Sequence, residues 1–130
     1  MPLVRISVHQ HVDAAKRRIL ADAAYDAMRT AFGIPEGDRF IVVTAHGEGE
    51  LFIGPDFMGV NRTEGYTLVH VTLRRGRTPE LKQAFYAELT KLFGERAGIA
   101  PDDVMIVLSE NESADWSFGR GEAQFLAPKP

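Results

Sequence analysis

The stretch AFGIPEGDRFIVV at residues 31–43 decides the fold, because its pattern recurs 65 positions later as RAGIAPDDVMIVL at residues 96–108. In each copy a glycine ends a helical pattern, an aspartate follows, and an apolar run typical of a strand comes next. A pattern that recurs at a fixed spacing indicates a duplicated structural unit. The corresponding pairs are Gly33 and Gly98, Ile34 and Ile99, and Asp38 and Asp103.

The same shift relates the segments that precede these two stretches. Residues 2–8 alternate between apolar and other side chains, which predicts a strand, and residues 13–32 have the apolar spacing of a helix with Asp13 as its N-cap. In the second copy a strand begins at residue 67, and a helix cap at Thr78 precedes Pro79, a proline at the favoured first helical position. We therefore expect a single domain with these parts: a repeat of about 2–46, a connection of 47–66, a repeat of about 67–109 and a tail of 110–130.

The two repeats predict an α/β (α+β) fold with a four-stranded mixed sheet. Each β-α-β unit joins two parallel strands by a right-handed crossover. Duplicated units usually pack about a pseudo-twofold axis, so the first strands of the two repeats should run antiparallel. Both helices would cover one face of the sheet, and association of subunits would cover the apolar side chains of the other. The candidates for that bare face are Val4, Ile6, Val69 and Val71, or the residues that alternate with them.

Composition limits the classes of protein to consider. The 130 residues are 45% hydrophobic and 25% charged, as in globular domains, and the formal net charge of −3 gives no basic surface for nucleic acid or membranes. The absence of cysteine excludes disulfides, thiolate metal sites and cysteine nucleophiles. Because no membrane-spanning run or signal peptide is visible, we expect a cytoplasmic protein that binds neither nucleic acid nor membranes.

The chain begins MPLVRISV, and the second residue raises a chemical possibility. Cytosolic processing usually removes a methionine that a small residue follows, and Pro2 would then carry a free secondary amine, a nucleophile and base that no internal residue supplies. The alternative is that Pro2 simply starts the strand, a position that proline tolerates. If Met1 is retained, the amine belongs to Met1 and the nitrogen of Pro2 is an amide.

The predicted topology brings polar residues to the sheet edge at which the first strand begins. The antiparallel strand ends there and continues into an arginine-rich segment, in which alternation predicts that Arg75 and Arg77 point to the same face as Pro2. Asp38 precedes a strand parallel to the first, so it lies at the same edge, as does the segment DWSFG of residues 115–119. An amine, a carboxylate, two guanidiniums and an aromatic wall suit the binding of a small oxo acid.

The sequence resembles the tautomerase superfamily and, within it, the malonate semialdehyde decarboxylase family. The resemblance extends over nearly the whole chain, and DWSFGRG is its most specific part. It implies a homotrimer that uses no cofactor. The similar segments are AFGIPEGDRF (31–40), RGRTPELK (75–82), AGIAPDDV (97–104) and ADWSFGRGEAQFL (114–126).

The resemblance also implies roles for particular residues. Two arginines would hold the substrate carboxylate, and aromatic residues of the tail would form the walls of the pocket. The implied catalytic residues are Pro2, Asp38, Arg75 and Arg77, and the implied substrate-binding residues are Arg75, Arg77, Trp116, Phe118 and Phe125.

The chain departs from the family pattern between the two arginines. The family has a proline there, whereas this chain has Gly76, and an additional Arg74 comes before the pair. Because glycine gives the backbone more freedom, the direction of the arginine side chains is less constrained by the sequence.

These observations predict an enzyme that uses Pro2, without a cofactor, on small 3-oxo or 2-oxo acids. The first reading is a lyase similar to malonate semialdehyde decarboxylase, with decarboxylase and hydratase activity. Two alternatives stay open: an isomerase that catalyses keto–enol tautomerisation of the phenylpyruvate type, and a non-catalytic trimeric binding protein. In the first two readings the partner is a small carboxylate substrate.

Two other groups of residues receive a structural interpretation. His9 and His11 stand two apart at a strand end, where a metal site is conceivable. The topology places no third ligand nearby, so we expect no metal. Asp102 and Asp103 lie at the opposite sheet edge from Pro2 and are expected to be structural.

Overall fold

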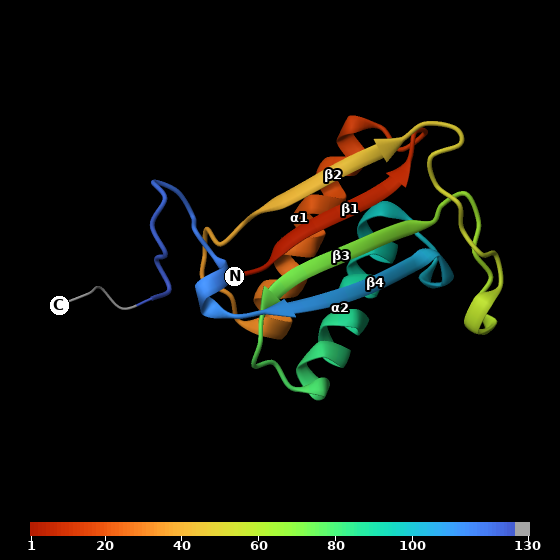
Figure 1. Cartoon of the computed structure of the whole chain (residues 1–130). Helices are drawn as coiled ribbons and strands as arrows, with labels where there is room; N and C mark the ends of the chain where they lie inside the picture. The colour runs from red at the N-terminus through yellow and green to blue at the C-terminus, as the bar shows by residue number, and fades with distance from the viewer. Residues whose placement is uncertain (127–130) are drawn as a thin grey trace.

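The computed structural model describes residues 1–126, so the last four residues of the predicted tail lie outside the described part. A four-stranded sheet and two long helices form the body of the protein (Figure 1). Short 3-10 helices occur in the connections. The main elements are β1 (Leu3–His9), α1 (Ala14–Phe32), β2 (Ile41–His46), β3 (Thr67–Arg74), α2 (Pro79–Ala97) and β4 (Val104–Asn111).

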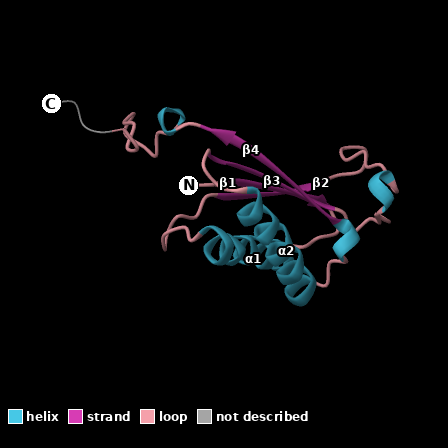
Figure 2. Cartoon of the chain, turned by 90° about the horizontal axis from the view of Figure 1, so that it is seen from below, coloured by secondary structure: helices cyan, strands magenta, loops and turns pink. Residues whose placement is uncertain are grey.

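The sheet has the order β2-β1-β3-β4. β1 pairs with β2 and β3 pairs with β4 in parallel, whereas the central strands β1 and β3 run antiparallel, with Val4 opposite Val71 and Ile6 opposite Val69. Both helices pack on the same face of the sheet (Figure 2). The predicted four-stranded mixed sheet, built from two β-α-β units with both helices on one face, is therefore confirmed.

Both helices begin and end at the residues that the sequence marks. The side chain of Asp13 accepts a hydrogen bond of 2.9 Å from the backbone N–H of Lys16, and Thr78 accepts one of 3.3 Å from Leu81. Gly33 and Gly98 end the helices with φ of 63° and 67°, a left-handed conformation that glycine adopts at low cost. Each helix is 19 residues long, so the two units match in length.

The helix-covered face of the sheet forms the core. Val4, Ile6, Val69 and Val71 are at most 1% exposed and pack against the helices, so they do not belong to the bare face. The bare face carries the residues that alternate with them, the second of the two expected sets. Its edge strands leave large apolar side chains exposed: Val42, Met105 and Val107 are 39–45% exposed.

The connection between β2 and β3 is held by the two aspartates before β4. Asp103 is buried and accepts hydrogen bonds of 2.6 Å from both the backbone N–H and the hydroxyl of Thr63. Asp102 accepts one of 2.9 Å from the N–H of Asn61. Both carboxylates therefore fasten the connection to the sheet, as expected for structural residues. Among residues 1–126 no helix has the length and apolarity that crossing a membrane requires.

Candidate active site

The amino-terminal amine and Asp38 form an ion pair where β1 begins. The nitrogen of Met1 lies 3.1 Å from Oδ2 of Asp38, and Asp38 is 7% exposed. Apart from this ion pair, neither carboxylate oxygen has a hydrogen-bond partner among residues 1–126. Pro2 is buried next to the pair, and with Met1 present its nitrogen is an amide. The structure therefore brings Pro2 and Asp38 to the same edge of the sheet.

Helix α1 fixes the loop that carries Asp38. The backbone N–H of Gly37 donates a hydrogen bond of 3.0 Å to the hydroxyl of Tyr25. The guanidinium of Arg39 lies 5.0 Å from the centre of the same ring and pairs with Asp22. Two residues of α1 thus hold the residues on either side of Asp38, which leaves its carboxylate directed at the amine.

The surroundings of the amine act on its charge in opposite directions. Burial lowers the pKa of the Met1 amine from its ordinary value of 8.0, and the charges of Arg77 and Arg74 lower that pKa further. The hydrogen bond and charge of Asp38 raise it, but the lowering effects are larger. The amine is thus easier to deprotonate than an exposed one, and Asp38 moderates the effect.

Arg77 points back towards the sheet edge rather than into solvent. Its Nη1 donates a hydrogen bond of 3.1 Å to the backbone carbonyl of Arg74, and its guanidinium lies 5.3 Å from the centre of the Phe32 ring. Burial and the neighbouring charge of Arg74 lower the pKa of Arg77, whereas Asp38 and Glu110 raise it. The charge of Arg77 therefore interacts with those of the Met1 amine and the Asp38 carboxylate.

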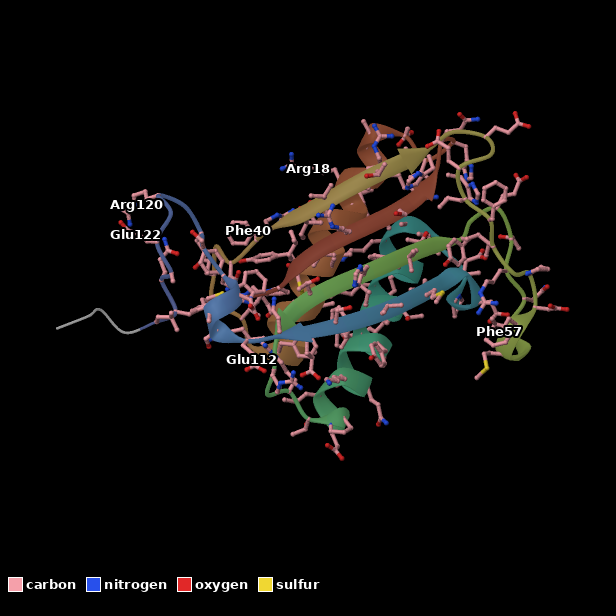
Figure 3. All side chains as sticks on the ribbon, viewed as in Figure 1. Arg18, Phe40, Phe57, Glu112, Arg120 and Glu122 are labelled. Atoms are coloured by element: carbon pink, nitrogen blue, oxygen red, sulfur yellow. The ribbon has the colours of Figure 1, made fainter. Side chains whose placement is uncertain are left out.

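Arg75 lies differently from what strand alternation predicts, whereas Arg74 continues the alternation of β3 on the face opposite the buried Leu73. The side chain of Arg75 is 62% exposed and its Nε donates a hydrogen bond of 2.8 Å to Glu112, one of the residues labelled in Figure 3. The guanidinium of Arg74 instead lies 3.8 Å from the centre of the Phe125 ring. Alternation ends with β3 at Arg74, and Gly76 then takes a φ of 131°, so parity does not extend to the residues that follow.

The aromatic residues of the tail gather beside the same edge. Trp116 stacks on Phe118 with ring centres 5.6 Å apart, and Phe118 meets Phe125 edge-on at 5.1 Å. The Trp116 ring nitrogen donates a hydrogen bond of 2.7 Å to Asn111 at the end of β4. Phe40, which the sequence analysis did not single out, also packs on Phe118 at 5.7 Å. The three aromatic residues predicted as pocket walls are therefore in one cluster.

Two hollows adjoin this edge and share Asn111. One, of about 440 Å³, is lined by Phe32, the segment 74–77 and Ser113 among others. The other, of about 460 Å³, is lined by Leu3, Phe40, Thr72 and residues 115–118. The arginine segment therefore lines the first hollow and the aromatic residues the second, and neither lining includes Pro2 or Asp38.

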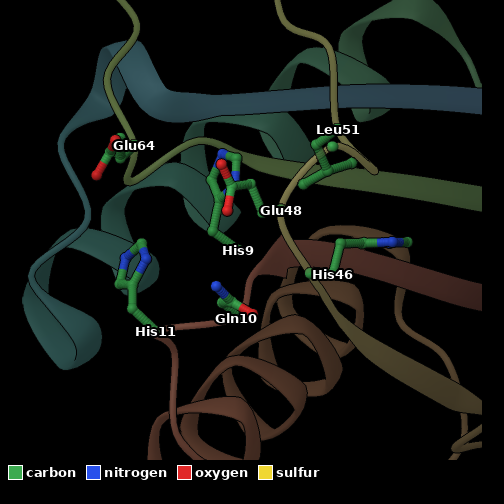
Figure 4. A pocket seen from close by; sticks show the side chains of 9 residues that line it. His9, Gln10, His11, His46, Glu48, Leu51 and Glu64 are labelled. Atoms are coloured by element: carbon green, nitrogen blue, oxygen red, sulfur yellow. The ribbon is translucent and has the colours of Figure 1, made fainter.

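A third hollow, of about 430 Å³, lies at the opposite edge of the sheet and contains three histidines (Figure 4). The rings of His9 and His11 stack with centres 6.1 Å apart, and His46 forms a 3.5 Å contact with Glu50. Within residues 1–126 no group of three or more histidine, aspartate or glutamate side chains is arranged to hold a metal ion.

Sequence comparisons show the family to which the chain belongs. Two family models, both described as tautomerase enzyme, match residues 38–119 and 2–61. The chain is 38% identical to the probable tautomerase YrdN of Bacillus subtilis (strain 168), with 99% of each chain covered. It is 32% identical to the probable tautomerase YusQ of the same organism, over 97% of this chain and 99% of that one.

Comparison with solved structures agrees with this family and identifies a narrower group of similar proteins within it. A malonate semialdehyde decarboxylase is 40% identical with a TM-score of 0.89 over 95% of each chain. A second one, inhibited by 3-bromopropiolate, is 36% identical with a TM-score of 0.89 over 95% of this chain and 93% of that one. A native fused 4-OT, 17% identical with a TM-score of 0.79 over 95% and 98%, shares the fold. The chain belongs to the tautomerase superfamily of enzymes and is similar, within it, to the malonate semialdehyde decarboxylases.

Proposed function

We propose that this enzyme decarboxylates a small 3-oxo acid and acts through the secondary amine of Pro2. The observation that carries the proposal is the buried Asp38 carboxylate, which lies 3.1 Å from the amino-terminal nitrogen and has no other partner among residues 1–126. A carboxylate in this position favours the charged form of an amine. The similarity to malonate semialdehyde decarboxylases supports 3-oxopropanoate (malonate semialdehyde) as the first substrate to test.

The amine of Pro2 takes part in the proposed reaction only after Met1 has been removed. Backbone nitrogens of successive residues are less than about 4 Å apart. Once Met1 is removed, the free nitrogen of Pro2 would therefore lie less than about 4 Å from the position at which the Met1 nitrogen now pairs with Asp38. Pro2 is already buried at this edge, and its ring fixes the direction of the backbone. The same burial and the same charges would act on the amine of Pro2.

The proposed reaction breaks the bond between the carboxylate carbon and its neighbouring carbon. The electron pair of that bond forms an enolate, whose negative charge collects on the aldehyde oxygen, and carbon dioxide leaves. The Pro2 ammonium donates a hydrogen bond to that oxygen as the charge develops. It then transfers a proton to the enolate carbon, which gives acetaldehyde, and regains a proton from water. Asp38 favours the protonated form of the amine, and it can also accept a proton from a water in a hydration reaction.

The arginines hold the substrate carboxylate in this proposal. Charge-assisted hydrogen bonds from guanidinium to carboxylate contribute about 1.5–3 kcal/mol each in a dry site. The charge of Arg77 acts on the amine and interacts with Asp38, while Arg75 lies at the exposed rim and is bonded to Glu112. Trp116, Phe118 and Phe125 form the opposite wall and exclude water.

Keto–enol tautomerisation of a 2-oxo acid is the second candidate. The surroundings that lower the pKa of the Met1 amine would also act on the Pro2 amine and so favour this reaction, because a neutral amine can remove a proton from the carbon next to the carbonyl. The curated relatives are called probable tautomerases. Turnover of malonate semialdehyde, phenylpyruvate and acetylenic acids by the same preparation separates the two activities. If none of them reacts, the non-catalytic binding protein becomes the better reading.

We also propose that the protein is a homotrimer. The bare sheet face and its exposed Val42, Met105 and Val107 need a cover that residues 1–126 do not supply. Two structurally similar fused 4-OT proteins are described as trimers, one symmetric and one asymmetric, and they support the proposal through the shared fold. Light scattering at micromolar protein tests it, and a monomer mass would contradict it.

A further inference from the structure

Glu112 is a carboxylate at the rim of the arginine-lined hollow, and the proposed reaction does not use it. It follows directly after β4, and among residues 1–126 it is the one acidic residue in the lining of that hollow. Its Oε1 accepts the hydrogen bond of 2.8 Å from Nε of Arg75. An acidic side chain of the protein therefore lies where an acidic substrate is expected to bind.

The backbone holds Glu112 in this position. The N–H of Arg75 donates a hydrogen bond of 2.8 Å to the carbonyl of Asn111, so the two chain segments lie side by side just beyond the sheet. Glu112 is also the N-cap of the 3-10 helix Ser113–Asp115. Its side chain accepts a hydrogen bond from the N–H of Asp115, and its own N–H donates one of 2.8 Å to the Asp115 carboxylate. The contact with Arg75 therefore follows from the way in which β3 and β4 end.

The ion pair occupies Arg75 in a way that a ligand can reverse. The hydrogen bond and the charge of Glu112 raise the pKa of Arg75. Both side chains are mostly exposed, at 62% and 63%, and exposed ion pairs contribute little to stability because water competes for both partners. A ligand carboxylate that also contacts Arg77 in the same hollow can therefore displace Glu112 from Arg75.

The charge of Glu112 also discriminates between ligands. A ligand with one carboxylate replaces Glu112 at Arg75, whereas a ligand of similar length with two carboxylates brings a second negative charge close to Glu112. Like charges repel, and a site can reject a competitor through such a repulsion. 3-Oxopropanoate and malonate differ in this respect, because malonate has a second carboxylate in place of the aldehyde.

We propose that Glu112 is a specificity-determining residue of the site, which occupies Arg75 in the free enzyme and disfavours dicarboxylates. An oxo acid with a single carboxylate then binds in preference to the corresponding diacid. This role of Glu112 rests on the proposed function in one respect, that Arg75 holds the substrate carboxylate, but it is tested without turnover.

The test compares Glu112→Gln with Glu122→Gln as a matched pair. Each change removes one negative charge from a mostly exposed side chain of the tail, but Glu122 pairs with Arg120, and neither of these two residues lines a hollow at this edge. Glutamine keeps an acceptor oxygen for the N–H of Asp115, so the 3-10 helix should persist. The probes are malonate and 3-hydroxypropanoate, an acid of the same length with one carboxylate. Calorimetry near neutral pH measures their dissociation constants.

The two probes should respond to Glu112→Gln by different amounts. We expect this variant to bind malonate about tenfold more tightly than the unmodified protein and 3-hydroxypropanoate about threefold more tightly. Glu122→Gln should change either constant by less than about twofold. Glu112→Ser removes the charge and keeps an N-cap oxygen, so it should give the same pattern and serves as a second variant if glutamine alters the fold.

No gain for either probe in Glu112→Gln and Glu112→Ser, an equal gain for both probes, or the same gain in Glu122→Gln would overturn the inference. Absence of binding of both probes to all four proteins would overturn it as well. Gains of the expected pattern without turnover of any oxo acid by the unmodified protein would instead refute the proposed function and leave the inference standing.

Discussion

Asp38 and Met1 meet in an ion pair of 3.1 Å at the start of β1, and the carboxylate of this pair is almost fully buried. Burial of a carboxylate is costly unless a cation or hydrogen-bond donors compensate it. The amino-terminal amine supplies that compensation here, and the carboxylate in turn raises the pKa of the amine.

Asp38→Asn tests the role of this carboxylate in the reaction. The change removes a negative charge that raises the pKa of the amine, so that pKa should fall further. We expect decarboxylase or hydratase turnover to fall by about a hundredfold or more. Phenylpyruvate tautomerisation should stay within about tenfold, because that step tolerates a neutral amine.

The isosteric asparagine preserves packing, so a cavity would not explain a loss. If both activities survived Asp38→Asn, the carboxylate would be no more than part of the loop between α1 and β2. The melting temperature of the variant serves as the control for folding.

The pH dependence should have opposite signs for the two candidate activities. Burial lowers the pKa of the Met1 amine, and the same surroundings should lower the pKa of the free Pro2 amine from its own ordinary value. Decarboxylation uses the ammonium, so its rate should fall as pH rises through that pKa, whereas tautomerisation uses the neutral amine and its rate should rise. Rate profiles between about pH 5 and 9 check this, and parallel profiles for both activities would show that the amine is not the shared group.

Gly76→Ala tests the path by which the chain leaves β3. A side chain at a φ of 131° is strained by about 1–3 kcal/mol, although no atom lies within 4 Å of the position of the added Cβ. We expect a lower melting temperature and weaker malonate binding, because the segment that carries Arg77 shifts.

Gly94→Ala is the matched control. Gly94 lies in α2, where its added Cβ would make an ordinary contact of 3.5 Å with the carbonyl of Ile99. Alanine favours a helix over glycine by up to about 1 kcal/mol, so this variant should be more stable. Equal effects of the two substitutions on stability and binding would contradict the account of Gly76.

Val107→Lys tests the bare sheet face as a subunit interface. Val107 is 39% exposed on that face, and a lysine buried between subunits would be unpaired. We expect light scattering to report dissociation of the trimer, whereas Ile19→Lys, at a residue of α1 that is 37% exposed on the helix side, should leave the assembly unchanged. Dissociation by Ile19→Lys alone would place the interface on the helices.

The sequence predicts the fold well because the signals that identify each helix and strand occur in both repeats. The glycines at the helix ends and the residues at the helix caps are local signals, and each occurs at matching positions of the two repeats. Handedness and pseudo-twofold symmetry then determine the strand order. The position of Asp38 at the edge of β1 follows from the same topology.

The directions of the arginine side chains after β3 could not be predicted from the sequence. Alternation is a property of a strand, and it cannot be extended through Gly76, whose backbone conformation is set by the turn. Arg75 is therefore exposed and bonded to Glu112, whereas alternation predicts it on the face of Pro2. Phe40 was missed because a single aromatic residue before a strand gives no signal, and its contact with Phe118 joins segments far apart in the sequence.

The central claim is that the free secondary amine of Pro2 carries the reaction, and comparison of two forms of the same chain tests it most directly. One form begins at Pro2, as verified by mass spectrometry, and the other retains Met1; turnover of malonate semialdehyde is measured for both. We predict that retention of Met1 lowers turnover by about 10²–10⁴-fold with no loss of folded structure, since it converts the amine of Pro2 into an amide. Equal turnover in the two forms would contradict the claim.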